Sequence, residues 1–256
     1  MADTKAPSET IDLPSKGWYY PPNHPLASGQ LDVFLMTARH EDILTSTNLI
    51  KKGIVLDRLM EELIASPLVK YEDLFLGDKN ALMIASRILG YGSEYPITIE
   101  CPSCGTKQDV TINLTQLKDK EVTFDPAQKG KNEFTFTLPV SKKVITFKLL
   151  THKDERNIDQ ELDAMRKIQR GDISKEVTTR MRYAITSVDG DAEGETIRAF
   201  VNQMPARDGV AFREYARKVN PDIDLSFDFE CTKCGHEEPR MEVPIDVTFF
   251  WPNVRV

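Results

Sequence analysis

Residues that commonly carry catalysis are scarce in this sequence. It has four histidines in four separate contexts, none within a metalloprotease or nucleophile motif: His24, His40, His152 and His236. A phosphate-binding loop is also absent, because Leu76-Gly77-Asp78-Lys79-Asn80 lacks the second glycine and the hydroxyl that such a loop requires. The sequence therefore predicts a protein that is not an enzyme and takes no small-molecule substrate.

Acidic residues are plentiful, but they form no recognisable site. Glu61-Glu62 and Glu237-Glu238 are adjacent in sequence, which is typical of a charged surface rather than of a catalytic acid and base. Asp189-Gly190-Asp191 lacks the ligand series and the closing glutamate of a calcium loop. We expect neither a calcium site nor an active site built on paired carboxylates.

Long hydrophobic runs are missing as well. No stretch approaches the roughly 18 consecutive apolar residues of a membrane span. Met1-Ala2-Asp3-Thr4-Lys5 lacks the charged and apolar regions of a secretory signal. We therefore expect no membrane association, and a protein that works inside a cell or inside something assembled there.

The sequence has no clustered basic region. Its 33 lysines and arginines are scattered among 40 acidic residues, for a net charge of −7. The small groups Lys142-Lys143 and Arg166-Lys167 are typical of solvated faces. Because proteins that bind DNA or RNA usually carry a concentrated basic footprint, nucleic-acid binding is disfavoured, although the residues leave it open.

The four cysteines of the chain all fall within two short motifs, Cys101-Pro102-Ser103-Cys104-Gly105 and Cys231-Thr232-Lys233-Cys234-Gly235. Two thiols separated by two residues and followed by glycine are typical of a zinc knuckle. The glycine suits the positive φ that such a tight turn requires. We predict one structural Zn²⁺, because four thiolates close its coordination sphere, with these ligands: Cys101, Cys104, Cys231 and Cys234.

The flanks of the two motifs resemble each other. Strand-like alternation leads into the first over residues 97–100 and into the second over 225–230, and apolar residues alternate again after each motif. Each cysteine pair should therefore lie at the tip of a β-hairpin, and the two hairpins should form one zinc ribbon. The 126 residues between Cys104 and Cys231 far exceed the usual spacing of about 15–20, so a whole domain must be inserted into the ribbon.

The cysteines allow other interpretations. Two redox-active pairs would each require the motif at the start of a helix, but glycine and strand-like residues follow here. Disulfides across the hairpins would require an oxidising compartment. His236 follows Cys234 closely enough to replace a cysteine as a metal ligand.

The sequence thus predicts an α+β protein with a helical N-terminal domain and a split four-cysteine zinc ribbon that carries an inserted α+β module. The expected segments are a disordered tail (1–12), an N-terminal arm, strand and helical domain (13–95), the first half of the ribbon (96–115), the inserted module (116–224), and the second half of the ribbon with a C-terminal strand (225–256).

Within the N-terminal domain, the proline-rich aromatic segment 13–22 should be an extended arm that packs on its own domain or on a neighbouring subunit. Residues 30–37 alternate as a strand does. Apolar spacing predicts a helix that starts after Thr37, a second helix from about Asn48 to Ser66, and a third from Gly77 to Gly90.

Within the inserted module, residues 133–138 and 143–149 should form a β-hairpin. Helical spacing follows in four segments: residues 158–165, 173–188, 197–201 and 205–219. The C-terminal stretch 243–252 reads as a strand with Phe249 and Trp251 on one face and Phe250 on the other. These aromatic residues should either pack against the arm or form an exposed partner interface.

Four motifs in order over residues 13–105 resemble the baseplate protein family of T-even-type, contractile-tailed bacteriophages. They are Leu13-Pro14-Ser15-Lys16-Gly17 with a Tyr-Pro step, Met36-Thr37 with Glu41-Asp42-Ile43-Leu44, Asp78 and Arg87 in a helix that leads to Tyr91-Gly92-Ser93-Glu94-Tyr95, and Cys101-Pro102-Ser103-Cys104. The second cysteine pair also fits, whereas the middle third of the chain contains no motif of the family.

The resemblance implies a structural virion protein of the central baseplate hub, or an assembly factor for that hub which is absent from the mature particle. Its partners would be other baseplate and hub proteins, with several copies in a symmetric assembly. It would lie in the tail baseplate after assembly in the host cytoplasm, with its extended arms on neighbouring subunits. The alternatives from other classes are a zinc-ribbon protein that binds nucleic acid and a redox enzyme that uses the two cysteine pairs.

Overall fold

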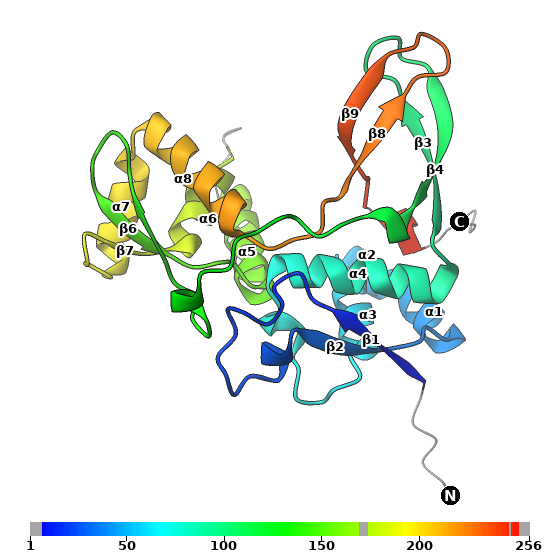
Figure 1. Ribbon diagram of the computed structural model, residues 1–256, viewed down its shortest axis with the longest axis horizontal. Helices are drawn as coiled ribbons and strands as arrows, with labels where there is room; N and C mark the ends of the chain where they lie inside the picture. The colour runs from blue at the N-terminus through cyan, green and yellow to red at the C-terminus, as the bar shows by residue number, and fades with distance from the viewer. Residues whose placement is uncertain (1–6, 169–173, 246, 251–256) are drawn as a thin grey trace, which may run out of the picture.

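The computed structural model describes residues 7–168, 174–245 and 247–250 and confirms the α+β class (Figure 1). Helix α4 (Leu76–Tyr91) lies at the centre of the molecule, and its buried residues span most of its length. The other N-terminal helices lie on one side of α4 and form the body together with it. The cysteine-bearing hairpins project from another side, and the inserted module lies beyond the amino-terminal end of α4. Among the described residues, no helix combines the length and the apolar content that crossing a bilayer needs.

The body begins with a short antiparallel sheet. Strand β1 (Ser8–Asp12) pairs with β2 (Gln30–Phe34), with Ser8 opposite Phe34. The predicted disordered tail over residues 1–12 is therefore wrong from Ser8 onward, while residues 1–6 lie outside the described part. The sequence does not indicate this strand, because the strand is almost wholly exposed and has no apolar face. Backbone pairing with β2 stabilises it instead.

The arm over residues 13–22 is not extended. It forms consecutive turns, in which Lys16 N–H donates to the Leu13 carbonyl at 2.8 Å and Trp18 N–H donates to the Ser15 carbonyl at 2.9 Å. Tyr19 and Tyr20 are buried in the core of the same chain. The arm therefore packs on its own domain, which is the first of the two predicted arrangements.

The helices of the body are α1 (Ala38–Leu44), α2 (Thr47–Lys51), α3 (Val55–Leu63) and α4. Thr37 precedes α1 as predicted, and its N–H donates to Nδ1 of His40 at 2.9 Å. The single helix predicted from Asn48 to Ser66 is wrong, because the helical conformation is interrupted between α2 and α3. Gly53 adopts a φ of 68° there, which lies outside helical geometry and suits glycine.

The two predicted cysteine hairpins are present. They are β3 (Glu94–Glu100) with β4 (Lys107–Asn113), and β8 (Ser226–Glu230) with β9 (Glu237–Glu242). They lie side by side, and we call the pair of hairpins the ribbon (Figure 1). After β9, the predicted C-terminal strand over residues 243–252 is wrong, because Val247–Phe250 form the 3₁₀ turn η5.

The C-terminal aromatic residues also pack differently from the prediction. Phe249 and Phe250 are both fully buried, so a strand with alternating faces does not describe them. Phe249 lies edge-on to Tyr95, with their ring centroids 4.9 Å apart, and η5 packs on α4. Trp251 lies outside the described residues.

The described residues of the inserted module form a three-stranded antiparallel sheet and four α-helices. These are β5 (Phe134–Thr137), β6 (Val144–Phe147), β7 (Ile185–Val188), α5 (His152–Ile168), α6 (Glu176–Ala184), α7 (Gly194–Gln203) and α8 (Ala206–Val219). The hairpin of β5 and β6 was predicted correctly. The helix predicted over residues 173–188 is too long, because α6 begins at Glu176 and stops at Ala184; Ile173 lies outside the described residues.

Strand β7 replaces the last turns of that predicted helix. Ile185 and Val188 are buried, and Val188 pairs with Ile145 of β6. The apolar spacing of Ile185 and Val188 fits a helix in isolation, but β-branched residues beside the open edge of β6 gain more from sheet pairing. Tertiary context therefore decides the conformation of this segment.

The module packs firmly on the body. The rings of Tyr19 and Phe134 meet at 5.1 Å, and the N–H of His152 donates to the Leu74 carbonyl at 2.9 Å. One continuous hydrophobic core includes residues from the body and from the module. The insertion is therefore anchored by its own core contacts as well as by the ribbon.

Two chain segments connect the ribbon to the module and run side by side, and we call them the neck (residues 117–120 and 220–225). Lys120 N–H donates to the Asp222 carbonyl at 2.8 Å, and Asp224 N–H donates to the Lys118 carbonyl at 2.7 Å. The neck lies directly on α4, because a Cβ added at Gly77 would be 2.0 Å from the Pro221 carbonyl oxygen. A glycine is therefore required at this crossing.

Candidate metal centre

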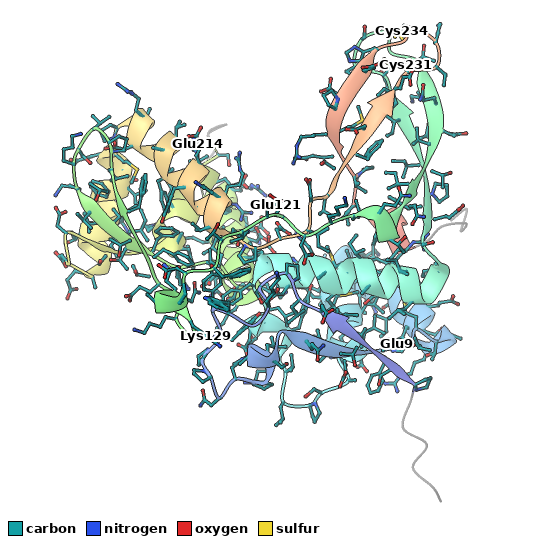
Figure 2. The ribbon with its side chains drawn as sticks, viewed as in Figure 1. Glu9, Glu121, Lys129, Glu214, Cys231 and Cys234 are labelled. Carbon is teal, nitrogen blue, oxygen red and sulfur yellow. The ribbon has the colours of Figure 1, made fainter. Side chains whose placement is uncertain are left out.

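The structure brings the four cysteines together at the tip of the ribbon. Their Sγ atoms all lie within 4.8 Å of one another, and Cys101 to Cys234 and Cys104 to Cys231 are both 3.8 Å apart. A tetrahedral metal with metal–sulfur bonds of about 2.3 Å has sulfur–sulfur edges of about 3.8 Å. The four side chains therefore fit a single tetrahedral metal ion. Figure 2 shows Cys231 and Cys234 at this tip, away from α4.

The two knuckles have nearly identical backbone geometry. In the first, Gly105 N–H donates to the Cys101 carbonyl at 2.9 Å, and in the second, Gly235 N–H donates to the Cys231 carbonyl at 2.9 Å. The two glycines have φ values of 66° and 68°. Both motifs therefore form tight turns between strands, and neither begins the helix that a thioredoxin-like redox pair requires.

The hairpins are held against each other by few contacts besides the thiols. A small buried cluster lies beneath the knuckles and consists of Ile99, Cys101, Phe229 and Cys231. The amide of Gln108 also bridges the hairpins, donating to the Glu230 carbonyl at 2.9 Å and accepting from Thr232 N–H at 3.0 Å. Such a small apolar cluster indicates that the ribbon depends on a further source of stability.

The electrostatics of the cluster favour a bound cation. The hydroxyl and the N–H of Thr106 lower the pKa of Cys104 to about 6, and the N–H of Cys234 lowers the pKa of Cys231. The N–H of His236 also favours the thiolate of Cys234, but burial and the three neighbouring sulfurs outweigh it and raise the pKa of Cys234 to about 11. A cation among the sulfurs would offset this repulsion and favour the thiolate of Cys234 at neutral pH.

The alternatives for the cysteines gain no support from this geometry. All four cysteines are free, with the paired Sγ atoms far beyond the disulfide bond length of about 2.05 Å. His236 contributes its backbone to the second knuckle, and its Nε2 lies 3.4 Å from a Glu238 carboxylate oxygen. Its imidazole therefore does not act as the fourth ligand.

Two polar residues buried in α4 bind segments from the two halves of the chain, the arm and the C-terminal turn η5. Near the start of the helix, the Asp78 carboxylate accepts from Ser15 N–H at 2.9 Å and from the Tyr20 hydroxyl at 2.8 Å. Burial raises the pKa of Asp78 to about 6, while the N–H and hydroxyl groups of Ser15 and the hydroxyl of Tyr20 favour its ionised form. Asp78 thereby fixes the turns of the arm on the body.

Arg87 performs the same task near the end of α4. Its side chain is 1% exposed and donates to three backbone carbonyls, those of Phe249 at 2.8 Å, Gly92 at 2.7 Å and Glu94 at 3.0 Å. One side chain therefore ties together the end of α4, the start of β3 and the C-terminal turn η5. It sets the base of the ribbon against the body.

A protein-family model described as T4 bacteriophage base plate protein matches residues 28–251. The chain belongs to this family. No curated protein and no solved structure matches the chain.

Membership in this baseplate family extends over the ribbon and the inserted module, including the middle third in which the sequence offered no family motif. The match leaves out the arm motif at residues 13–17, although the structure gives that motif a clear role beside Asp78. Asp78 and Arg87 were noted only as parts of a resemblance. Their hydrogen bonds to distant residues show what each of them does in this fold.

Sequence reasoning missed a buried charged cluster between the body and the module. His152, which is 3% exposed, places Nε2 3.2 Å from Asp57 Oδ1 and Nδ1 3.7 Å from Glu155 Oε2. Lys79 Nζ lies 2.6 Å from Glu155, and the ring of Tyr71 covers the imidazole at 4.3 Å. The only available signal was a lone histidine at the start of a helix, which does not reveal its partners.

We expect the stability of this baseplate-family protein to fall as the pH rises through neutrality. Burial opposes the charge on His152, but Asp57 and Glu155 outweigh it and raise the His152 pKa above 6.5. The protonated form therefore stabilises the fold fully below pH 6.5, and this contribution is lost as the pH rises through the folded-state pKa. Urea unfolding from pH 5.5 to 8.5 should show this decline.

The matched variant is His152→Gln, which cannot gain a proton, and His24→Gln serves as the control at a more exposed histidine. The decline should be smaller in His152→Gln than in the wild type and should persist in full in His24→Gln. Equal pH profiles for the wild type and His152→Gln would contradict the role of this ion pair.

Proposed function

We propose that this baseplate-family protein is a structural component of the central hub of a contractile tail and is not an enzyme. The observation that carries the proposal is the family match over residues 28–251, together with a candidate site that has a closed set of four thiols. Such a set offers no open position for water or substrate.

In this proposal, Cys101, Cys104, Cys231 and Cys234 bind one structural Zn²⁺. Thiolate ligands in a tetrahedral arrangement favour zinc among the common divalent ions. The ion would join two hairpins that enclose an insertion of 126 residues. It would therefore hold both ends of the module at one place and fix the ribbon relative to α4.

The protein would act as an adaptor, with the ribbon and the module presenting separate surfaces to other baseplate and hub proteins, in several copies within a symmetric assembly. The charge of the ribbon argues against nucleic acid as the partner. Residues 94–113 and 226–242 contain eight acidic residues against three lysines or arginines. A phosphate backbone would be repelled by this surface.

Quantitative mass spectrometry of purified virions and of hub intermediates tests the proposal. We expect the protein at a fixed whole-number copy number per baseplate in both, and tails without a complete baseplate when its gene is deleted. Presence in the intermediates alone would identify the assembly-factor alternative instead. Absence from both would contradict a structural role in the baseplate.

A further inference from the structure

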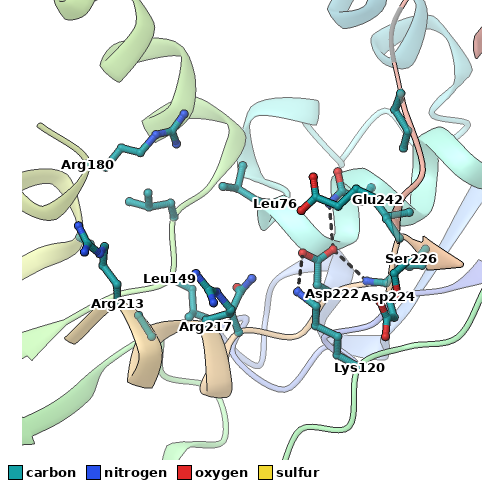
Figure 3. A pocket seen from close by; sticks show the side chains of 18 of the residues that line it. Leu76, Lys120, Leu149, Arg180, Arg213, Arg217, Asp222, Asp224, Ser226 and Glu242 are labelled. Atoms are coloured by element: carbon teal, nitrogen blue, oxygen red, sulfur yellow. Dashed lines mark hydrogen bonds and ion pairs between the residues drawn. The ribbon is translucent and has the colours of Figure 1, made fainter. Parts of the chain in front are cut away.

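A large groove lies between the module and the neck, with α6 and α8 on one side and the neck and β9 on the other (Figure 3). Its volume is about 1120 Å³, which exceeds the roughly 300–1,000 Å³ of typical small-molecule pockets. We infer that this groove binds a segment of a neighbouring baseplate protein that carries both acidic and apolar side chains. The inference rests on the proposed structural role and names the chemistry of one partner.

The floor of the groove is apolar. Leu149, Met181 and Phe212 line it and are themselves almost fully buried, and Val177 of α6 lies at its margin with 49% of its surface exposed. An exposed valine beside an apolar floor provides a place for an aliphatic or aromatic side chain. The groove can therefore bury apolar groups of a partner without rearranging the core.

The charges that line the groove differ from those of the whole chain. Six lysines and arginines line it against four acidic residues, although the chain carries a net charge of −7. The acidic residues of the neck are already paired: Asp222 lies 3.4 Å from Lys120, and Asp224 lies 2.9 Å from Arg240. Most of the negative charge in the groove is thus neutralised within the chain.

Two of the cations have no such partner. Arg213 and Arg217 lie one turn apart on α8, are exposed, and form no ion pair within the described part of the chain. Arg180 on α6 is paired with Glu176 at 3.1 Å. Figure 3 shows Arg213 and Arg217 on α8 and Asp222 and Asp224 on the opposite side of the groove. Because guanidinium groups bind carboxylates with two parallel hydrogen bonds, this pair matches two acidic side chains of a partner.

A protein segment fits these observations better than nucleic acid does. The apolar floor offers no contact that phosphates could use, and the two arginines form no extended basic surface of the kind that a polyanionic backbone requires. A segment with two or more Asp or Glu residues beside an apolar side chain would instead satisfy both the arginines and the floor. Its source would be another baseplate protein, because the family assembles with such proteins.

The test is site-specific photo-crosslinking within assembling baseplates. The full chain carries Val177→benzoylphenylalanine, baseplates are assembled from the other proteins of the phage, and crosslinked peptides are identified by mass spectrometry. We expect one acidic segment from another baseplate protein. Arg213→Glu with Arg217→Glu should reduce the crosslink yield by about tenfold or more. Arg207→Glu, on α8 but outside the groove, should leave it unchanged.

Thermal unfolding checks that each variant folds, and Arg213→Gln with Arg217→Gln replaces the charge reversal if it does not. Crosslinks to nucleic acid, to a second copy of this chain, or to a segment without excess acid would overturn the inference. Incorporation into baseplates without any crosslink in the groove would also overturn it while preserving the proposed function. Failure of the chain to enter baseplates at all would instead contradict the proposed function.

Discussion

Cys231→Ser is expected to release the bound metal and unfold the ribbon while the body and the module stay folded. The buried cluster of the ribbon is small, so we expect its hairpins to depend on the proposed metal. Structural zinc contributes about 10–16 kcal/mol of apparent binding free energy in small zinc-dependent peptides. The module, in contrast, shares the large core of the body and does not need the ribbon to remain packed.

Hydrogen exchange measured by mass spectrometry distinguishes these regions. In Cys231→Ser, the amides of β3, β4, β8 and β9 should exchange rapidly, whereas those of α4 and α5 should keep their wild-type protection. Ser103→Ala is the matched control, because this exposed residue lies within the first knuckle and offers no metal ligand. Unchanged protection of the ribbon in Cys231→Ser would show that the hairpins are stable without metal.

Arg87→Met should destabilise the fold by about 3–5 kcal/mol, which is a large part of the total stability of a typical protein. The substitution leaves the carbonyls of Phe249, Gly92 and Glu94 without their buried donor. Each unsatisfied buried acceptor costs about 1–3 kcal/mol. The guanidinium also lies over three aromatic rings, Tyr91, Tyr95 and Phe249, so its loss removes cation–π contacts as well.

Urea unfolding followed by circular dichroism gives the size of this effect. Arg87→Lys should recover only part of the loss. An ammonium group lacks the planar fork of N–H donors with which the guanidinium reaches three carbonyls. Arg58→Met is the control: Arg58 is exposed and pairs with Glu61 and Glu62 on the surface, so it should cost less than about 1 kcal/mol. A similar small cost for Arg87→Met would contradict the assigned role of Arg87.

The ribbon could be predicted from the sequence because its signals are local. The cysteine spacing, the following glycines and the flanking alternation each report on the few residues around them, and both hairpins form where these signals indicated. The pairing of the two hairpins across 126 residues followed from counting cysteines, since neither pair alone completes a tetrahedral site.

The remaining features depend on contacts between distant residues. Ile185 lies in a strand because β7 pairs with the edge of β6, and β1 forms because it pairs with β2. Asp78, Arg87 and His152 obtain their roles from partners that lie far away in sequence, such as Ser15, Phe249 and Asp57. No local pattern around these residues could reveal such partners.

Metal content of the purified full-length chain, measured by elemental analysis with a parallel thiol titration, tests the central claim most directly. The account predicts one zinc per chain and four thiols that react only after a strong chelator removes the ion. A metal-free protein whose four thiols react at once while its hairpins remain protected from hydrogen exchange would contradict it.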